Sequence, residues 1–194
     1  MSEDKVKSHA ALVVMDIQRT AVAYIGDDHA FLSRLVQAIE TARKAEIMVI
    51  YVRARFREGY PEISPHNRLF SRGLSSGWLT PPVLEIHPAI AFQPNDVVVT
   101  KLRASAFCGS DLEVILRSQA ISHLILCGIA TSGVVLSTAL EAADKDYELT
   151  VLSDCCADAD EEVQRVLLTK IFPRYTEVIT VEEWEQKWSD SAVE

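Results

Sequence analysis

Short apolar runs alternate with segments of helical spacing along most of this sequence. Six runs have the length and composition of buried strands: Ala11–Ile17, Glu46–Val52, Asp96–Lys101, Ser122–Gly128, Leu149–Asp154 and, more weakly, Glu177–Val181. Four segments between them have helical spacing: Ala30–Lys44, Ser110–Gln119, Ser132–Lys145 and Asp160–Phe172. This alternation is typical of parallel sheets covered by helices on both faces. We therefore predict the α/β class, as a three-layer α/β/α sandwich with a mainly parallel six-stranded sheet.

Length, composition and charge indicate a globular domain and argue against nucleic-acid and membrane partners. At 194 residues and 48% apolar content, the chain can bury a full core, and we expect one domain over 1–194 with its core at about 11–184. A net charge of −9 argues against a nucleic-acid partner. Because no apolar run is long enough to span a bilayer, we expect no membrane partner. The charged start lacks the apolar stretch of a secretory signal, and the four cysteines form no disulfide pattern, so we expect a cytoplasmic protein.

Polar residues at the ends of the predicted strands are the first candidates for a functional site. In an open parallel sheet, ligands bind beyond the carboxyl ends of the strands. Asp16 closes the first predicted strand, Arg53 follows the second and Lys101 closes the third. The turn Gly128–Ser132 follows the fourth, and Asp154–Cys156 the fifth. These segments should therefore converge at one edge of the sheet.

Taken singly, these residues have simpler interpretations. Asp16 could cap the next segment or pair with a surface lysine, and a lysine such as Lys101 is often solvated. Together they would lie in one crevice, where each favours the ionised form of the other by lowering the pKa of Asp16 and raising that of Lys101. The turn at 128–133 could hold a developing negative charge on its N–H groups, or be only a glycine-assisted turn with a hydroxyl cap.

Three blocks of sequence resemble the isochorismatase-like hydrolase superfamily. The run from Leu12 to Gln18 is similar to its opening strand, and Lys101–Phe107 to its lysine strand with the Ser-Ala-Phe turn. The segment Leu126–Thr131 is similar to its fourth-strand turn. The blocks occur in the family order, and the similarity runs from about Ala11 to Trp184.

The resemblance implies a Rossmann-like fold and a set of roles. Asp16 would be the acid/base residue and Lys101 its electrostatic partner. Ala130 and Thr131 would form the oxyanion turn, where family members often have a cis peptide before the Thr-like position. The resemblance also implies a homodimer or homotetramer. The predominantly apolar helix expected at 132–143 hints at a subunit interface.

One departure from the family pattern changes the expected mechanism. In the amidase branches a nucleophilic cysteine lies three residues after the Thr-like position, and here that residue is Val134. Valine has no lone pair and cannot form an acyl-enzyme. The metal-binding Asp-x-His of nicotinamidases is replaced by Tyr51-Val-Arg-Ala-Arg-Phe56, so we expect no metal and no cofactor.

Three hypotheses of function follow. True isochorismatases also lack the cysteine; there the aspartate protonates an enol ether and water attacks the resulting cation. By this resemblance the chain would be a hydrolase without a covalent intermediate. Alternatively, it is an inert small-molecule-binding or scaffold member of the same fold. As a third hypothesis, Cys108, which lies before a predicted helix, replaces the missing nucleophile in an amidase.

We expect the ligand to be a small anion that binds residues from several segments. The stretch after the second strand is basic in an otherwise acidic chain, and guanidinium groups suit carboxylates. These arginines could equally be solvated. Our candidate substrate-binding residues are Gln18, Arg53, Arg68 and Phe107.

Overall fold

Six parallel strands form one sheet in the order β3-β2-β1-β4-β5-β6. In this computed structural model the described residues are 9–26, 28–80, 84–90, 92–93 and 96–191. The strands are Ala10–Met15 (β1), Met48–Ala54 (β2), Val97–Lys101 (β3), His123–Ile129 (β4), Glu148–Ala157 (β5) and Glu177–Ile179 (β6). Every pairing between them is parallel, and the predicted α/β fold is thereby confirmed.

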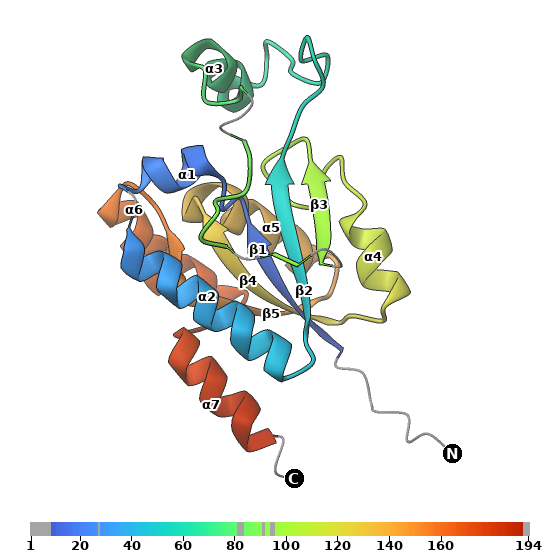
Figure 1. The fold of residues 1–194 in the computed structure, drawn as a ribbon, viewed down its shortest axis with the longest axis vertical. Coiled ribbons are helices and arrows are strands. Elements are labelled where there is room, and N and C mark those ends of the chain that lie inside the picture. Colours follow the sequence, from blue (N-terminus) through green and yellow to red (C-terminus); the bar gives the residue numbers. More distant parts are fainter. Residues whose placement is uncertain (1–8, 27, 81–83, 91, 94–95, 192–194) are drawn as a thin grey trace.

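Helices cover both faces of the sheet (Figure 1). The α-helices of the described residues are Arg19–Tyr24 (α1), His29–Lys44 (α2), Arg68–Ser76 (α3), Leu112–Ser118 (α4), Leu136–Asp144 (α5), Glu161–Val166 (α6) and Val181–Ser191 (α7). Figure 1 shows α2 and α7 in front of the sheet and α5 behind it. The chain builds outward from β1 to β3 and then from β4 to β6, so the strand order reverses between β1 and β4. Ligands of such sheets bind at this reversal.

The central strands are apolar throughout because both of their faces are covered. All six residues of β1 are buried, as are the last six residues of β4. Their side chains join those of α2 and α5 in one large cluster. The helix α2 begins where the Asp28 carboxylate accepts hydrogen bonds from the backbone N–H groups of Ala30 and Phe31. Burial of the apolar strands thus fixes the sheet, and capping fixes where this helix starts.

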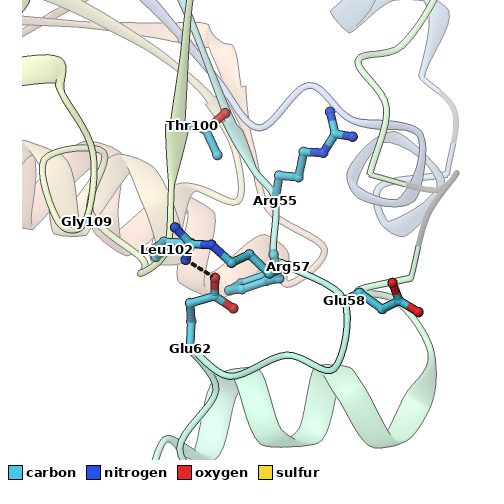
Figure 2. Close-up of a pocket in the computed structure, with 8 residues that line it drawn as sticks. Arg55, Arg57, Glu58, Glu62, Thr100, Leu102 and Gly109 are labelled. Carbon is cyan, nitrogen blue, oxygen red and sulfur yellow. Dashed lines mark hydrogen bonds and ion pairs between the residues drawn. The ribbon is translucent and has the colours of Figure 1, made fainter.

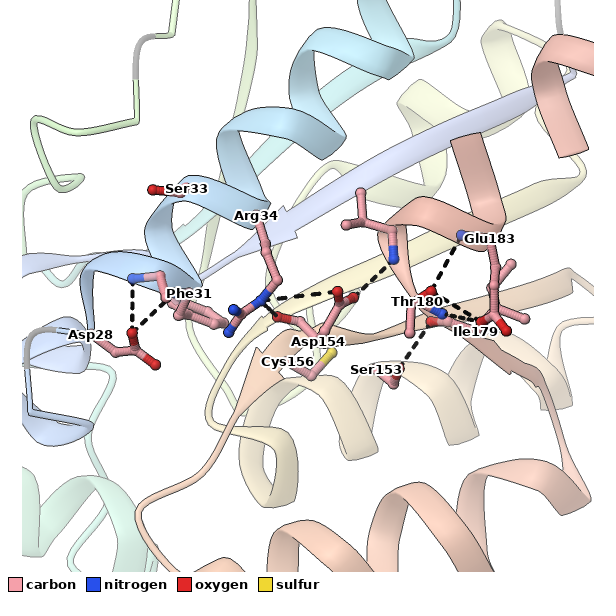
Figure 3. A network of polar contacts seen from close by, with 12 residues as sticks. Asp28, Phe31, Ser33, Arg34, Ser153, Asp154, Cys156, Ile179, Thr180 and Glu183 are labelled. Atoms are coloured by element: carbon pink, nitrogen blue, oxygen red, sulfur yellow. Dashed lines mark hydrogen bonds and ion pairs between the residues drawn. The ribbon is translucent and has the colours of Figure 1, made fainter. Parts of the chain in front are cut away.

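An irregularity in β5 sets the register next to β4. Leu126 pairs with Val151, but Gly128 pairs with Cys156, so β5 carries extra residues between the two pairs. Asp154 lies in this bulge (Figure 3), where its carbonyl accepts a hydrogen bond from Arg34 Nε at 2.8 Å. The same residue's carboxylate accepts from the N–H of Val181 at 2.9 Å. The bulge is therefore fastened to α2 and to the start of α7.

The connection between β2 and β3, residues 55–96, contains a helix that we did not predict. The helix α3 is capped by the Asn67 side chain and ends at Gly77, whose φ is +80°. It lies beyond the carboxyl ends of the strands (Figure 1). A second apolar cluster supports it, made of Phe70, Leu79 and Leu84 with Phe56, Ile63, Leu74 and Trp78 packed against them. This part of the connection therefore has a small core of its own.

Other boundaries also differ from expectation. Two predicted helices contain single π-helical turns, Thr131–Val135 before α5 and Leu167–Ile171 after α6. The helices α1 and α7 were not predicted. The helix α6 follows Asp160, whose carboxylate accepts from the N–H groups of Glu162 and Val163.

Candidate active site

We had expected Asp16 to be the closing residue of the first strand. It lies instead one residue beyond the end of β1. Its φ of +55° is in the left-handed region, which aspartate tolerates better than most residues. Its backbone N–H still donates to the carbonyl of Val52 at 2.8 Å, which anchors it to β2. The left-handed residue ends the strand abruptly at the reversal point between β1 and β4.

Lys101, the last residue of β3, forms an ion pair with Asp16. The distance from Lys101 Nζ to Asp16 Oδ2 is 2.8 Å, and the side chains are 3% and 15% exposed, respectively. The ammonium also donates to the carbonyl of Arg103 at 2.9 Å. The other carboxylate oxygen, Asp16 Oδ1, is buried and has no hydrogen-bond partner among the described residues. One oxygen of the carboxylate is thus held by the ammonium group, and the other is enclosed by the protein.

Burial raises the pKa of Asp16, and the nearby Lys101 and a backbone hydrogen bond from Ala54 only partly oppose this. The lysine lowers the pKa of Asp16 as we had expected, but the net direction is upward, which corrects the expectation of a low pKa. Removing a carboxylate from water disfavours its charged form, and here this cost exceeds the attraction of one ammonium group. The local environment therefore favours a protonated Asp16 more than a surface position would.

The turn after β4 begins with a cis peptide between Ile129 and Ala130. Thr131 and Val134 are both buried, and the Thr131 hydroxyl has no partner among the described residues. Ser132 donates from its N–H and from its hydroxyl to Asp158, at 2.9 and 2.6 Å. The sequence had not identified Asp158 as a candidate site residue. Sequence spacing gives no sign of a bond between two separate turns.

Gln18 is buried, and backbone groups occupy its amide. It donates to the carbonyls of Ala54 and Leu84 and accepts from the N–H of Ala54 at 3.0 Å. Its amide therefore links the end of β2 to the β2–β3 connection. A contribution of Gln18 to substrate binding would act through this positioning.

The other predicted substrate-binding residues are dispersed. Arg53 belongs to β2, not to the loop after it, and its Nη1 lies 3.8 Å from Glu85 Oε2. Arg68 is exposed at the start of α3. Phe107 is buried, with its ring 6.0 Å from that of Tyr147. The ammonium of Lys145 lies 5.5 Å from the same Phe107 ring. Phe107 is thus a packing residue of the α4–α5 face in this structure.

The four thiols are free and fall into two classes. Cys108 is exposed, in the turn between β3 and α4, whereas Cys127, Cys155 and Cys156 are buried. Burial raises the pKa of each of these three thiols, to about 12 for Cys156. A protonated thiol is a poor nucleophile, so Cys108 is the most accessible of the four for chemistry.

Two open clefts lie along the outer side of the edge strand β3. The larger, about 600 Å³, is lined by Arg55, Phe56, Arg57, Glu58, Glu62, Thr100, Leu102 and Gly109 (Figure 2). The second, about 550 Å³, shares Thr100 and Gly109 with it. Neither Asp16 nor Lys101 lines these two clefts.

Two features, a metal-binding cluster and a membrane-spanning helix, are absent from the described residues. No group of three or more His, Cys, Asp or Glu side chains there could hold a metal ion. None of the helices in that part of the chain is both long enough and apolar enough to cross a membrane.

The fold and the ion pair together define a parallel α/β protein with a carboxylate–lysine site at the reversal of its strand order. The family model for the isochorismatase domain matches residues 10–183, and the chain belongs to the isochorismatase family of hydrolases. It is 32% identical to the uncharacterized isochorismatase family protein YwoC of Bacillus subtilis (strain 168), over 90% of this chain and 91% of that protein.

The chain is also similar to a curated amidohydrolase and to a solved cysteine hydrolase structure. The chain is 28% identical to the ureidoacrylate amidohydrolase RutB of Azorhizobium caulinodans, over 92% of this chain and 90% of RutB. Among solved structures, a cysteine hydrolase from Pseudomonas syringae pv. phaseolicola 1448A superposes with a TM-score of 0.85. That match has 26% identity and covers 94% of this chain and 93% of the other.

Proposed function

We propose that the chain hydrolyses a small carboxylated molecule by proton transfer at Asp16, without an acyl-enzyme. The observation that carries this is the buried ion pair, in which Lys101 occupies Asp16 Oδ2 and leaves Oδ1 without a partner. When Asp16 is protonated, the proton belongs on Oδ1, because Oδ2 faces the ammonium group. Oδ1 is then the atom that exchanges the proton with the substrate.

The raised pKa of Asp16 supports the role of a general acid. An acid must hold its proton at the working pH, and burial of Asp16 moves its pKa in that direction. An anionic substrate that displaces water beside the carboxylate would raise the pKa further. Protonation of an enol ether by Oδ1–H followed by attack of water needs no protein nucleophile, and this agrees with Val134 at the position of the cysteine.

Two observations, the charge of the site and the substrate named for one relative, support a carboxylated ligand. Lys101 supplies a buried positive charge at the site. The ureidoacrylate of RutB carries a carboxylate, and this relative covers most of the chain. We therefore favour a small carboxylated substrate, with the cationic residues Arg53 and Arg68 contributing attraction.

Amidase chemistry is the second candidate, with Cys108 as a substitute nucleophile. The exposure of Cys108 and the amidohydrolase relative favour it. Against it, Cys108 lies in the turn between β3 and α4, not in the turn after β4. An inert binding protein is the remaining alternative, for which the chain would have no need of Asp16 as a titrating group.

The deciding experiment is a turnover screen of the purified chain with isochorismate, simple amides and N-carbamoyl compounds. Asp16→Asn keeps the shape of the side chain and removes the exchangeable proton. We expect it to lower turnover by a factor on the order of hundreds. Full activity in this variant would refute the proposal, and loss of activity only in Cys108→Ser would favour the amidase.

A further inference from the structure

We infer that Asp158 is a positioning residue, whose carboxylate holds the turn after β4 against the Asp16–Lys101 pair. This inference rests on the proposed function, because it assigns a role within the same site. Asp158 lies beyond β5, so it reaches the turn from a separate element. Its Oδ2 accepts both hydrogen bonds that Ser132 donates, from the backbone N–H at 2.9 Å and from Oγ at 2.6 Å.

The turn needs such an outside partner at its start. Ala130 precedes it and has no side-chain oxygen with which to cap the first N–H groups. The Ala130 carbonyl accepts from the N–H groups of Gly133 and Val135, at 3.0 and 3.4 Å. Asp158 satisfies the N–H of Ser132, which precedes both of these donors. Hydrogen bonds to a charged acceptor are about twice as strong as neutral ones. Asp158 therefore fixes the one turn that also carries Thr131 and Val134.

The irregular strand β5 puts Asp158 in place. Beyond the bulge, Ile129 pairs with Ala157, so Asp158 comes next to the first residue of the turn. The bulge is held by the Arg34 and Val181 contacts of Asp154 (Figure 3). A regular β5 would place a different residue opposite Ile129. The register of β5 thus determines which side chain meets Ser132.

Asp158 also joins the turn to α6. Its second oxygen, Oδ1, accepts from the N–H of Asp160 at 3.4 Å. Asp160 in turn caps α6 through two bonds of 3.0 Å. The two acidic residues are therefore close in sequence but act on different elements. Of the two carboxylates, that of Asp160 caps the helix, and that of Asp158 accepts the hydrogen bonds from the turn.

A reporter thiol at position 134 tests the inference without a substrate. In a Cys108→Ser background, Val134→Cys places a thiol on the turn, and its ionisation is followed by thiolate absorbance near 240 nm against pH. Because position 134 is buried, the midpoint is compared between variants and not with the value of a free thiol. If residue 134 faces Lys101, Lys101→Met should raise the midpoint; a midpoint that does not rise in this variant would contradict the inference, because the turn would not face the pair.

Asp158→Ala should raise this midpoint by about half a unit or more, because the thiol moves away from the ammonium group. Loss of the negative charge alone would lower the midpoint, so the sign separates the two effects. Asp158→Asn keeps an acceptor oxygen and should not raise it. Asp160→Ala is the matched control and should leave the midpoint unchanged while weakening α6. A midpoint that Asp158→Ala leaves unchanged or lowers would overturn the inference.

Two additional measurements keep the result clear. Ser132→Ala removes only the hydroxyl bond and should give a smaller rise, which guards against a folding defect in Asp158→Ala. Turnover in the Asp16→Asn variant tests the proposed function separately. An active Asp16→Asn chain would refute the acid role of Asp16, whereas an unchanged reporter would refute only the role of Asp158.

Discussion

Gly128 of β4 lies directly against the carbonyl group of Met15 at the end of β1. A Cβ built on Gly128 would overlap the Met15 carbonyl oxygen, and the φ of +150° at this glycine is one that other residues rarely adopt. The two strands on either side of the reversal can therefore approach closely only with glycine at this position. Asp16 and the turn after β4 follow immediately from these two residues.

Gly128→Ala should consequently destabilise the fold by about 2–4 kcal/mol, from backbone strain and overlap. Gly133→Ala is the matched control, because its added Cβ would meet only the Cβ of Ala130 at an ordinary 3.8 Å. Chemical denaturation of both variants measures the free energy of unfolding. Equal values for the two would show that the strands separate without cost.

The raised pKa of Asp16 predicts how stability depends on pH. A carboxyl group whose folded pKa is raised contributes stability below its ordinary pKa of 3.8, and this is lost as pH rises through the folded pKa. Asp16→Asn has no such loss. The stability of the variant relative to the original chain should therefore increase between pH 4 and the folded pKa. A constant or falling difference across denaturation curves in this range would contradict the raised pKa.

Lys101→Met keeps most of the apolar stem and removes the charge that opposes the raised pKa of Asp16. With a compound that the chain turns over, the fall in kcat/KM at high pH should move to higher pH. KM for carboxylated substrates should also increase, because a buried positive charge is lost. Lys44→Met at the opposite edge, at the end of α2, should change neither quantity. An unshifted pH profile would separate Lys101 from the proton transfer.

The thiols should react with iodoacetamide in two separate phases. Cys108 is exposed and should be modified first, whereas Cys127, Cys155 and Cys156 are buried with raised pKa values. Mass spectrometry of peptides at increasing times gives the order. If catalysis uses no cysteine, modification of Cys108 or its replacement by serine leaves turnover intact. Abolished turnover in a folded Cys108→Ser chain would reverse that conclusion.

Removal of charge from the basic segment should separate binding of anions from that of neutral analogues. Arg53→Gln and Arg68→Gln should weaken binding of carboxylates more than of their amides, by an estimated several-fold each. Arg53 is partly compensated by Glu85, so its effect should be the smaller. Isothermal titration with paired ligands measures the difference. Equal weakening of both ligand types would indicate a packing role.

The sheet was predictable because its strands are short apolar runs, and the central strands are buried on both faces. The missed helices had weaker signals. In α7 the apolar residues Val181, Trp184 and Trp188 recur at helical spacing, and α3 has an Asn67 cap and a Gly77 end. These signals could have been found.

The site was only partly predictable for a different reason. The proximity of Asp16 and Lys101 was predictable, because the carboxyl ends of parallel strands lie at the same edge of the sheet. The direction of the Asp16 pKa depends on burial depth, and the Asp158–Ser132 bonds depend on the β5 bulge. Both arise from contacts between distant segments, which local spacing does not encode.

The helix α3 packs on a small apolar core that is separate from the core around the strands. Its members, which include Phe70, Leu79 and Trp78, are distinct from those of the main cluster around the strands. We therefore expect substitutions within this small core, such as those at Phe70 or Trp78, to leave the packing of the strands that carry Asp16 and Lys101 in place. The shape of the segment beyond the strand ends can then change while the ion pair is kept.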